Sequence, residues 1–187
     1  MIKEKDFPGR TVRDYYKEEE LQVLNTVPTA EGAVAIAMNE MPTTINGSKT
    51  LIMGFGRVGK TLGLVLRGLG ALVTVATRNA TERAVCEILG FEVVDYPALN
   101  KSIGAFGLIF NTVPAVLLTE ELLENVADGT PVIDLATHPG GVDASAAERL
   151  GKNVIWALGL PGKVAPVTAG RYIKKTVCAI LKEEKII

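Results

Sequence analysis

Residues Gly54 to Thr61 read GFGRVGKT, a glycine-rich stretch that follows a short apolar run. It satisfies two phosphate-binding patterns at once. As G-x-G-x-x-G it is the turn of a dinucleotide-binding βαβ unit, and as G-x-x-x-x-G-K-[ST] it is a Walker A loop for ATP or GTP. The two patterns predict different proteins, a nicotinamide enzyme or a nucleoside triphosphatase.

The residues around the motif favour the dinucleotide pattern. Gly56 lets the backbone approach a pyrophosphate closely, which a Walker loop does not require, and Gly59 allows close packing of helix on strand. The apolar run before the loop, residues 50–53, is typical of a buried parallel strand. A Walker site would also need Mg²⁺ and an acidic strand end, which VIDLA at 132–136 imitates, so this alternative stays open.

Short apolar runs alternate with amphipathic segments from residue 50 to the end of the chain. This alternation predicts an α/β fold, a Rossmann-type doubly wound parallel sheet in three αβα layers. We expect residues 1–24 to form an N-terminal helical arm and residues 25–187 to form the dinucleotide-binding domain. Pro28 and Thr29 should begin a helix that Thr29 caps, and Trp156 should lie in the core.

Composition excludes several classes of function. The 187 residues are 48% hydrophobic and carry a net charge of -1, which argues against electrostatic binding to nucleic acid or a membrane surface. The first residues, MIKEKDFPGR, lack the apolar segment of a signal peptide. Cys86 and Cys178 lie far apart among apolar residues, which predicts buried free thiols. Together these features predict a cytoplasmic protein with no metal site.

The end of the second strand predicts the form of the cofactor. NAD enzymes usually place Asp or Glu there, about 20 residues beyond the glycines, to hold the ribose 2′-hydroxyl. Here the strand ends in Thr77-Arg78-Asn79, with Arg83 a turn later and Glu82 expected on the helix face. Arg78 is suited to a 2′-phosphate, with Thr77 and Asn79 as further donors. We therefore expect NADP, with NAD as the alternative; a solvated Arg78 is the competing interpretation.

Later strand ends carry further candidates, because ligands of open α/β sheets collect at the carboxyl ends of the strands. The stretch NTVPA places Asn111 and Thr112 where they can meet the cofactor ribose, and IDLATHPGG offers Asp134 and the only histidine, His138. Asp134 is equally explained as a residue that caps its loop, and His138 as a surface residue. The cofactor-binding set that the pattern predicts is Gly54, Phe55, Gly56, Arg57, Val58, Gly59, Thr77, Arg78, Asn79, Asn111, Thr112, Val113, Pro114, Asp134 and Leu135.

The stretch GLPGKVAPVTAG supplies the candidate substrate contacts. Lys163 is the one cation of this segment, which we expect to be a loop before the final helix, and Thr168 follows it. We expect Lys163 and Thr168 to contact the substrate and His138 to act as the base. Plain solvation of Lys163 is the competing interpretation.

Five stretches together resemble a known family. They are NTVPTAEG, GFGRVGKT, FNTVPA, IDLATHPGG and GLPGKVAPVTAG, which span the chain from about residue 24 to its end, and they are similar to the A subunit of bacterial dipicolinate synthase. The cofactor domain of that family is similar to those of 2-hydroxyacid dehydrogenases and adenosylhomocysteinase. Their long interdomain helix corresponds here to PTAEGAVAIAMNE.

The resemblance implies an NADP-linked oxidoreductase of sporulation, which makes dipicolinate from dihydrodipicolinate or its hydrated form. It also implies a partner, the flavoprotein-like B subunit of dipicolinate synthase, and we expect a homo-oligomer. Members of the family carry a further N-terminal α/β domain, so we expect residues 1–24 to be the remnant of a missing domain. In related dehydrogenases the substrate lies between two domains, and this chain would supply one wall of that cleft.

Three other functions compete with this one. In the first, the chain is an NADP-binding module without chemistry of its own. In the second, it is the cofactor domain of a 2-hydroxyacid dehydrogenase-like enzyme. In the third, which follows from the Walker pattern, it is a nucleoside triphosphatase. The first predicts cofactor binding without turnover, and the last predicts that Lys60 binds Mg²⁺-ATP.

Overall fold

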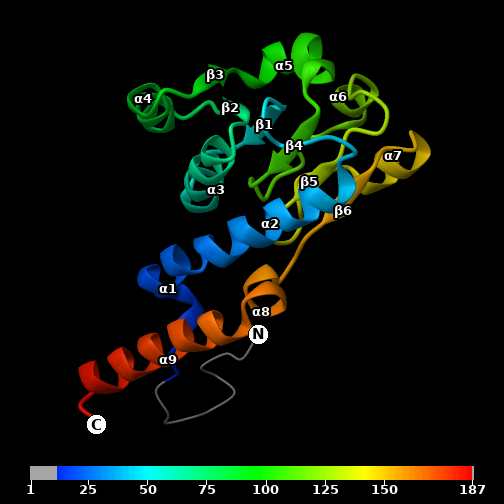
Figure 1. Ribbon diagram of the computed structural model, residues 1–187. Coiled ribbons are helices and arrows are strands. Elements are labelled where there is room, and N and C mark those ends of the chain that lie inside the picture. The colour runs from blue at the N-terminus through cyan, green and yellow to red at the C-terminus, as the bar shows by residue number, and fades with distance from the viewer. Residues whose placement is uncertain (1–11, 187) are drawn as a thin grey trace.

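The computed structural model describes residues 12–186. Its centre is one parallel sheet of six strands in the order β3-β2-β1-β4-β5-β6 (Figure 1). The strands are β1 (Lys49–Met53), β2 (Leu72–Ala76), β3 (Glu92–Val94), β4 (Leu108–Asn111), β5 (Val132–Asp134) and β6 (Val154–Trp156). Strand order reverses between β1 and β4, which is the doubly wound arrangement that the sequence predicts.

Helices cover both faces of this sheet, so the molecule has three layers. One face packs against α2 (Thr26–Glu40), α3 (Arg57–Gly68) and α4 (Ala80–Leu89), and the other against α5 (Tyr96–Ser102), η3 (Ile103–Ala105), α6 (Glu120–Glu124) and α7 (Ala144–Arg149). Adjacent residues of β1 serve opposite faces, because side chains alternate along a strand: Ile52 packs on the α3 side and Leu51 on the α6 side.

A group of helices extends from the sheet as an arm. It contains η2 (Tyr15–Lys17), α1 (Glu19–Leu24), α8 (Leu160–Val164) and α9 (Pro166–Glu183), and α9 packs along α1 (Figure 1). An ion pair between Lys175 and Glu20 joins α9 to α1. Helix α8 packs closely on α2 at Gly32, where a Cβ atom would lie 3.1 Å from Val164 and 3.2 Å from Leu160. In residues 12–24, the described part of the expected arm, η2 and α1 are helical, and residues 1–11 lie outside the described chain.

Two helix starts differ from the sequence prediction because proline is tolerated in the first turn of a helix. Helix α2 begins at Thr26, two residues before Pro28, and Thr29 does not cap it: its Oγ1 donates to the carbonyl of Asn25 at 2.7 Å. The segment before the final helix is also not a loop. It forms α8 with Pro161 in its first turn, and α9 begins at Pro166.

Trp156 is not a core residue, contrary to the sequence prediction. It ends β6 with 43% of its surface exposed, and its Nε1 donates to the carbonyl of Ala136 at 2.8 Å. An edge strand of three residues has solvent beside it, and an indole needs an acceptor, so the side chain turns to the next loop. Cys86 is a buried free thiol, as predicted, whereas Cys178 is free but only partly buried.

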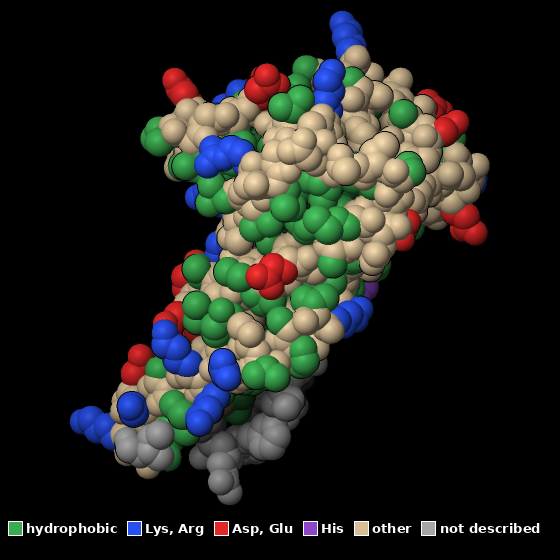
Figure 2. Space-filling view, in the orientation of Figure 1, with side chains coloured by type: hydrophobic (Ala, Val, Ile, Leu, Met, Phe, Trp, Pro, Cys, Tyr) green, Lys and Arg blue, Asp and Glu red, His purple; other side chains and the backbone are tan. Residues whose placement is uncertain are grey.

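Exposed hydrophobic side chains lie on the helical arm and its junction with α2. Figure 2 shows such side chains along this part of the molecule, interspersed with Lys and Arg. They include Val23 on α1, Val27 on α2, Val164 on α8 and Val167 on α9, each at least 43% exposed. Within residues 12–186, no helix is both long and apolar enough to cross a lipid bilayer.

Candidate dinucleotide-binding site

The carboxyl ends of five strands lie in one row. Register pairs Ala76 with Met53, Met53 with Asn111, Asn111 with Asp134, and Asp134 with Trp156. The loops that follow these residues therefore emerge side by side at one edge of the sheet. Ligands of such sheets bind at this edge, beside the point where strand order reverses.

The glycine loop takes the compact form that a dinucleotide needs. Gly54 has a φ of +85°, and a Cβ there would lie 2.5 Å from Val113 Cγ2 and 2.8 Å from Thr112 Oγ1. A Cβ on Gly59 would overlap the carbonyl oxygen of Gly54, so this glycine permits the helix to pack against the strand. A Cβ on Gly56 would meet no protein atom within 4 Å. The bare backbone of Gly56 is thus open to a ligand.

Helix α3 presents its amino end to the same space. It begins at Arg57, and the first intrahelical bond runs from the Lys60 N–H to the Gly56 carbonyl at 3.0 Å. The N–H groups of residues 57–59 precede that bond and have no partner within the helix. Such N–H groups and the helix dipole favour a phosphate.

This geometry disfavours the Walker pattern. Residues that would wrap around a triphosphate in a Walker loop are already helical from Arg57 onward. The hydroxyl of Thr61, which would bind Mg²⁺, lies 2.8 Å from Thr26 Oγ1 on α2 instead. The hydroxyl of Thr26 itself donates to the carbonyl of Val23 at 2.7 Å. Thr61 therefore joins α3 to α2.

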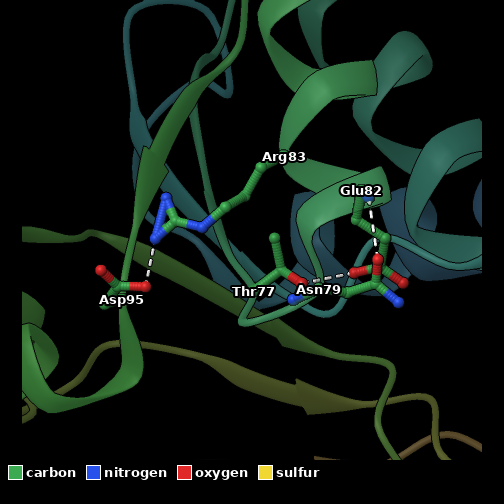
Figure 3. Close-up of polar contacts among 5 residues, drawn as sticks. All are labelled: Thr77, Asn79, Glu82, Arg83 and Asp95. Atoms are coloured by element: carbon green, nitrogen blue, oxygen red, sulfur yellow. Dashed lines mark hydrogen bonds and ion pairs between the residues drawn. The ribbon is translucent and has the colours of Figure 1, made fainter.

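The turn after β2 is organised by its own side chains (Figure 3). Thr77 Oγ1 donates to Glu82 Oε2 at 2.5 Å and accepts from the Asn79 N–H at 3.1 Å. Asn79 Oδ1 caps α4 by accepting from the N–H groups of Thr81 and Glu82 at 2.9 and 3.2 Å. Thr77 is buried, so its hydroxyl is occupied within the turn. Arg83 points away and forms an ion pair with Asp95.

The sequence predicts that Glu82 lies on the face of its helix, but its carboxylate turns toward the glycine loop. Its Oε2 also accepts from the backbone N–H of Phe55 at 3.1 Å, so the carboxylate reaches from α4 to the glycine loop. Arg78 is exposed on the same side. Tyr96 lines the same cleft as both residues. Burial raises the pKa of its phenol, Glu82 raises that pKa further and Arg78 lowers it.

Asn111 and Asp134 hold the loops rather than point into the open space. Asn111 is fully buried, and its Nδ2 donates to Asp134 Oδ1 at 2.8 Å and to the Val113 carbonyl at 3.0 Å. Asp134 Oδ1 also accepts from the Ala136 N–H at 3.0 Å, and its Oδ2 from the Gly141 N–H at 2.8 Å. The contacts of Asp134 are therefore those of a residue that caps its loop.

These loops enclose a cleft of about 730 Å³. Eleven of the fifteen residues predicted to contact the cofactor line it, and the other four, Phe55, Gly59, Asn111 and Asp134, are buried and do not line it. The lining residues from the predicted set are Gly54, Gly56, Arg57, Val58, Thr77, Arg78, Asn79, Thr112, Val113, Pro114 and Leu135. A second cavity, of about 510 Å³, lies at the opposite edge near Lys49 and Leu72.

Several lining residues were not predicted to contact the cofactor, including Lys60, Glu82 and Tyr96. The position of Lys60, directly after the last glycine of the motif, could have suggested that it lines the cleft, although the dinucleotide pattern gives it no role. Glu82 and Tyr96 carry none, because only the fold brings α4 and α5 back to the glycine loop.

The three predicted catalytic residues are not among those that line the cleft. His138 follows β5, and its ring meets Trp156 edge-on with centroids 4.7 Å apart. Lys163 lies on α8 and Thr168 in the first turn of α9. Both helices follow β6, whose end belongs to the same row.

The fold and the cleft define a class, the Rossmann-type dinucleotide-binding domain. Within that class the chain is similar to the A subunit of dipicolinate synthase over most of its length. It is 32% identical over 168 residues to that protein from Bacillus subtilis, covering 90% of this chain and 57% of the relative. The structure of the Bacillus halodurans relative is 33% identical, with a TM-score of 0.89 over 92% of this chain and 59% of that one.

These matches confirm the resemblance drawn from the five motifs. The chain spans somewhat less than three-fifths of the length of these relatives. Transhydrogenase from Sinorhizobium meliloti shares the fold, with a TM-score of 0.77 at 18% identity over 87% of this chain and 56% of that one. No protein-family model matches the sequence.

Proposed function

We propose that this chain is the cofactor-binding part of an NADP-dependent oxidoreductase that forms dipicolinate from dihydrodipicolinate or its hydrated precursor. The glycine loop carries the proposal: a bare backbone at Gly56, in front of the free N–H groups of α3, beside the exposed guanidinium of Arg78. The similarity to the A subunit of dipicolinate synthase supports the choice of substrate. Sporulation and a cytoplasmic location follow from the same proposal.

NADP is the proposed form of the cofactor because of the residues at the end of β2. Arg78 is exposed, lines the cleft and has no salt-bridge partner among residues 12–186. A guanidinium free of other partners can pair with a 2′-phosphate through two parallel hydrogen bonds. Thr77 contributes less than expected, since its hydroxyl is occupied by Glu82 and Asn79.

The proposed reaction is a hydride transfer. A ring carbon of the dihydropyridine gives up a hydride and the ring loses a proton, so the products are dipicolinate, reduced cofactor and H⁺. The bound cofactor supplies the hydride acceptor, and aromatisation of the ring drives the step. The chain contributes by binding and orienting the reactants.

We propose His138, Lys163 and Thr168 for the substrate side of the cleft. Lys163 and Thr168 would hold the two carboxylates, and His138 would accept the proton. Their place after β5 and β6 supports this assignment, because the loops of these strands adjoin the cleft. A second wall of the cleft would come from a further domain.

The B subunit of dipicolinate synthase and a second copy of this chain are the proposed partners. The exposed apolar side chains on α1, α2, α8 and α9 offer a surface for such contacts. An NADP-binding module without turnover of its own is the second candidate, favoured by a cleft that none of the three candidate catalytic residues lines.

The test is calorimetry with NADP⁺ and NAD⁺, followed by an assay for the pyridine dicarboxylate with and without the B subunit. We expect NADP⁺ to bind, and Arg78→Asp to weaken it by roughly 1–3 kcal/mol, the scale of a charge-assisted hydrogen bond. Product formed only when the B subunit or the further domain is added supports the proposal. Binding without product under every condition selects the module, and no binding of either dinucleotide rejects both candidates.

A further inference from the structure

Glu82 occupies an unusual position at the cleft. It belongs to the first turn of α4, three residues after the Asn79 cap, yet its carboxylate lies against the glycine loop. Two donors fix it there, the Phe55 N–H at 3.1 Å and the Thr77 hydroxyl at 2.5 Å. Both donors bind Oε2, and a carboxylate offers about four acceptor sites. Glu82 therefore retains acceptor capacity toward the cleft that it lines.

The glycine loop determines what lies next to this carboxylate. A pyrophosphate over Gly56 and the α3 N–H groups leads its adenosine ribose toward the end of β2. The residue at that strand end is Thr77, which has no charge and whose hydroxyl donates to Glu82. In many NAD-binding domains an Asp or Glu at the strand end provides the acceptor for the ribose. In this chain Glu82, on the helix that follows, is the carboxylate at that place.

Glu82 and Arg78 share this region without neutralising each other. Among residues 12–186, the salt bridges of the chain include none between Arg78 and Glu82. Arg83, the other nearby cation, is paired with Asp95. A ligand that enters the adenosine end of the cleft therefore meets one anchored carboxylate and one free guanidinium. Both charges act on the pKa of Tyr96, which Glu82 raises and Arg78 lowers.

We infer that Glu82 is a specificity-determining residue that accepts a hydrogen bond from the ribose 2′-hydroxyl of NAD and repels the 2′-phosphate of NADP. Arg78 acts in the opposite direction. The site accordingly binds both dinucleotides, and the balance between the two side chains sets its preference. This inference rests on the proposed function, since it requires a dinucleotide over the glycine loop.

The experiment compares the dissociation constants of NAD⁺ and NADP⁺ for the unmodified chain and three variants. Glu82→Gln keeps an amide oxygen for the Phe55 and Thr77 donors but removes the charge. We expect it to raise the ratio of NADP⁺ to NAD⁺ affinity by about tenfold or more, the effect of one charge-assisted contact. Arg78→Gln should lower that ratio. Glu87→Gln, on the exposed side of the same helix, is the matched control and should leave it unchanged.

A role of Glu82 confined to holding the loop predicts something different. Glu82→Gln would then weaken both dinucleotides by the same factor, and an unchanged ratio overturns the inference. A second measurement needs no variant: 2′-deoxy-NAD⁺ should bind the unmodified chain about tenfold more weakly than NAD⁺ does. Equal affinity of these two also overturns it. Failure of the unmodified chain to bind NAD⁺ and NADP⁺ at all rejects the proposed function as well, so the two failures are distinguishable.

Discussion

The Nδ2 of Asn111 donates to Oδ1 of Asp134 at 2.8 Å, and this bond joins the ends of β4 and β5 beneath the cleft. Asp134 also accepts from the N–H groups of Ala136 and Gly141 at 3.0 and 2.8 Å. One buried carboxylate thus fixes the course of two loops that line the site. Its contribution is to the shape of the cleft.

Asp134→Ala should lower the free energy of unfolding by about 3 kcal/mol, because it leaves several buried donors without an acceptor. Urea denaturation followed by far-UV circular dichroism measures the change. Both dinucleotides should lose affinity by similar factors, since the residue supports the cleft and does not discriminate between them. A variant as stable as the unmodified chain would show that water replaces the carboxylate.

Gly56→Ala should separate binding from folding. The new Cβ meets no protein atom within 4 Å, so the free energy of unfolding should change by less than about 0.5 kcal/mol. Dinucleotide affinity should fall at least about tenfold, because the methyl group occupies the approach of the pyrophosphate. Calorimetry and urea denaturation on the same preparation give both quantities. Gly68→Ala, at the far end of α3 and equally free of contacts, should change neither.

Gly59→Ala should instead destabilise the whole domain. Its Cβ would overlap the Gly54 carbonyl oxygen, and backbone cannot move aside as a flexible side chain can. We expect a loss of about 2 kcal/mol or more, in line with overpacking at a close helix–strand contact. The midpoint of thermal unfolding measures it, and an unaltered midpoint would contradict the close packing of α3 on β1.

Thr61→Val should weaken the junction of α2 and α3 and leave dinucleotide affinity unchanged. The hydroxyls of Thr26 and Thr61 lie 2.8 Å apart, and the Arg57 carbonyl, 3.4 Å from Thr61 Oγ1, is a weaker alternative acceptor. Loss of this one bond should cost about 1 kcal/mol of stability. Denaturation and calorimetry check the two halves of the prediction. Loss of Mg²⁺-ATP binding in this variant would revive the Walker interpretation.

Cys86 should resist alkylation in the folded protein. Burial raises the pKa of its thiol to about 11, and the neighbouring Glu82 contributes to the increase. At pH 8 only about one thiol in a thousand is then ionised, and the thiolate is the reactive species. Iodoacetamide labelling followed by mass spectrometry should modify Cys178 first, because Cys178 is only partly buried. Equal labelling after addition of urea is the control.

The sequence was sufficient for the sheet and for the glycine loop. Each strand is a short apolar run, and each glycine of the motif has a local reason to be glycine, so nearby residues carry the information. Two helix starts were predicted wrongly at prolines. Pro28 and Pro161 both lie inside a first helical turn, where an N–H would have no intrahelical acceptor, so proline costs nothing there.

The rest of the site depended on contacts between distant segments. Glu82 reaches Phe55, 27 residues earlier in the chain, and Asn111 meets Asp134, 23 residues later. No periodicity or spacing predicts such pairs, because they follow from strand order and from which face each helix covers. The same holds for Trp156, whose exposure results from the position of β6 at the edge of the sheet.

The bond between Glu82 and the Phe55 N–H should also affect how fast a dinucleotide binds. This bond ties the glycine loop to α4, so we expect the loop to keep its curvature without a bound nucleotide. The entropy of ordering that loop is therefore lost when the chain folds and not on each encounter. Association with a dinucleotide should then proceed in a single phase, at a rate set by diffusion and orientation with no slower step of loop rearrangement.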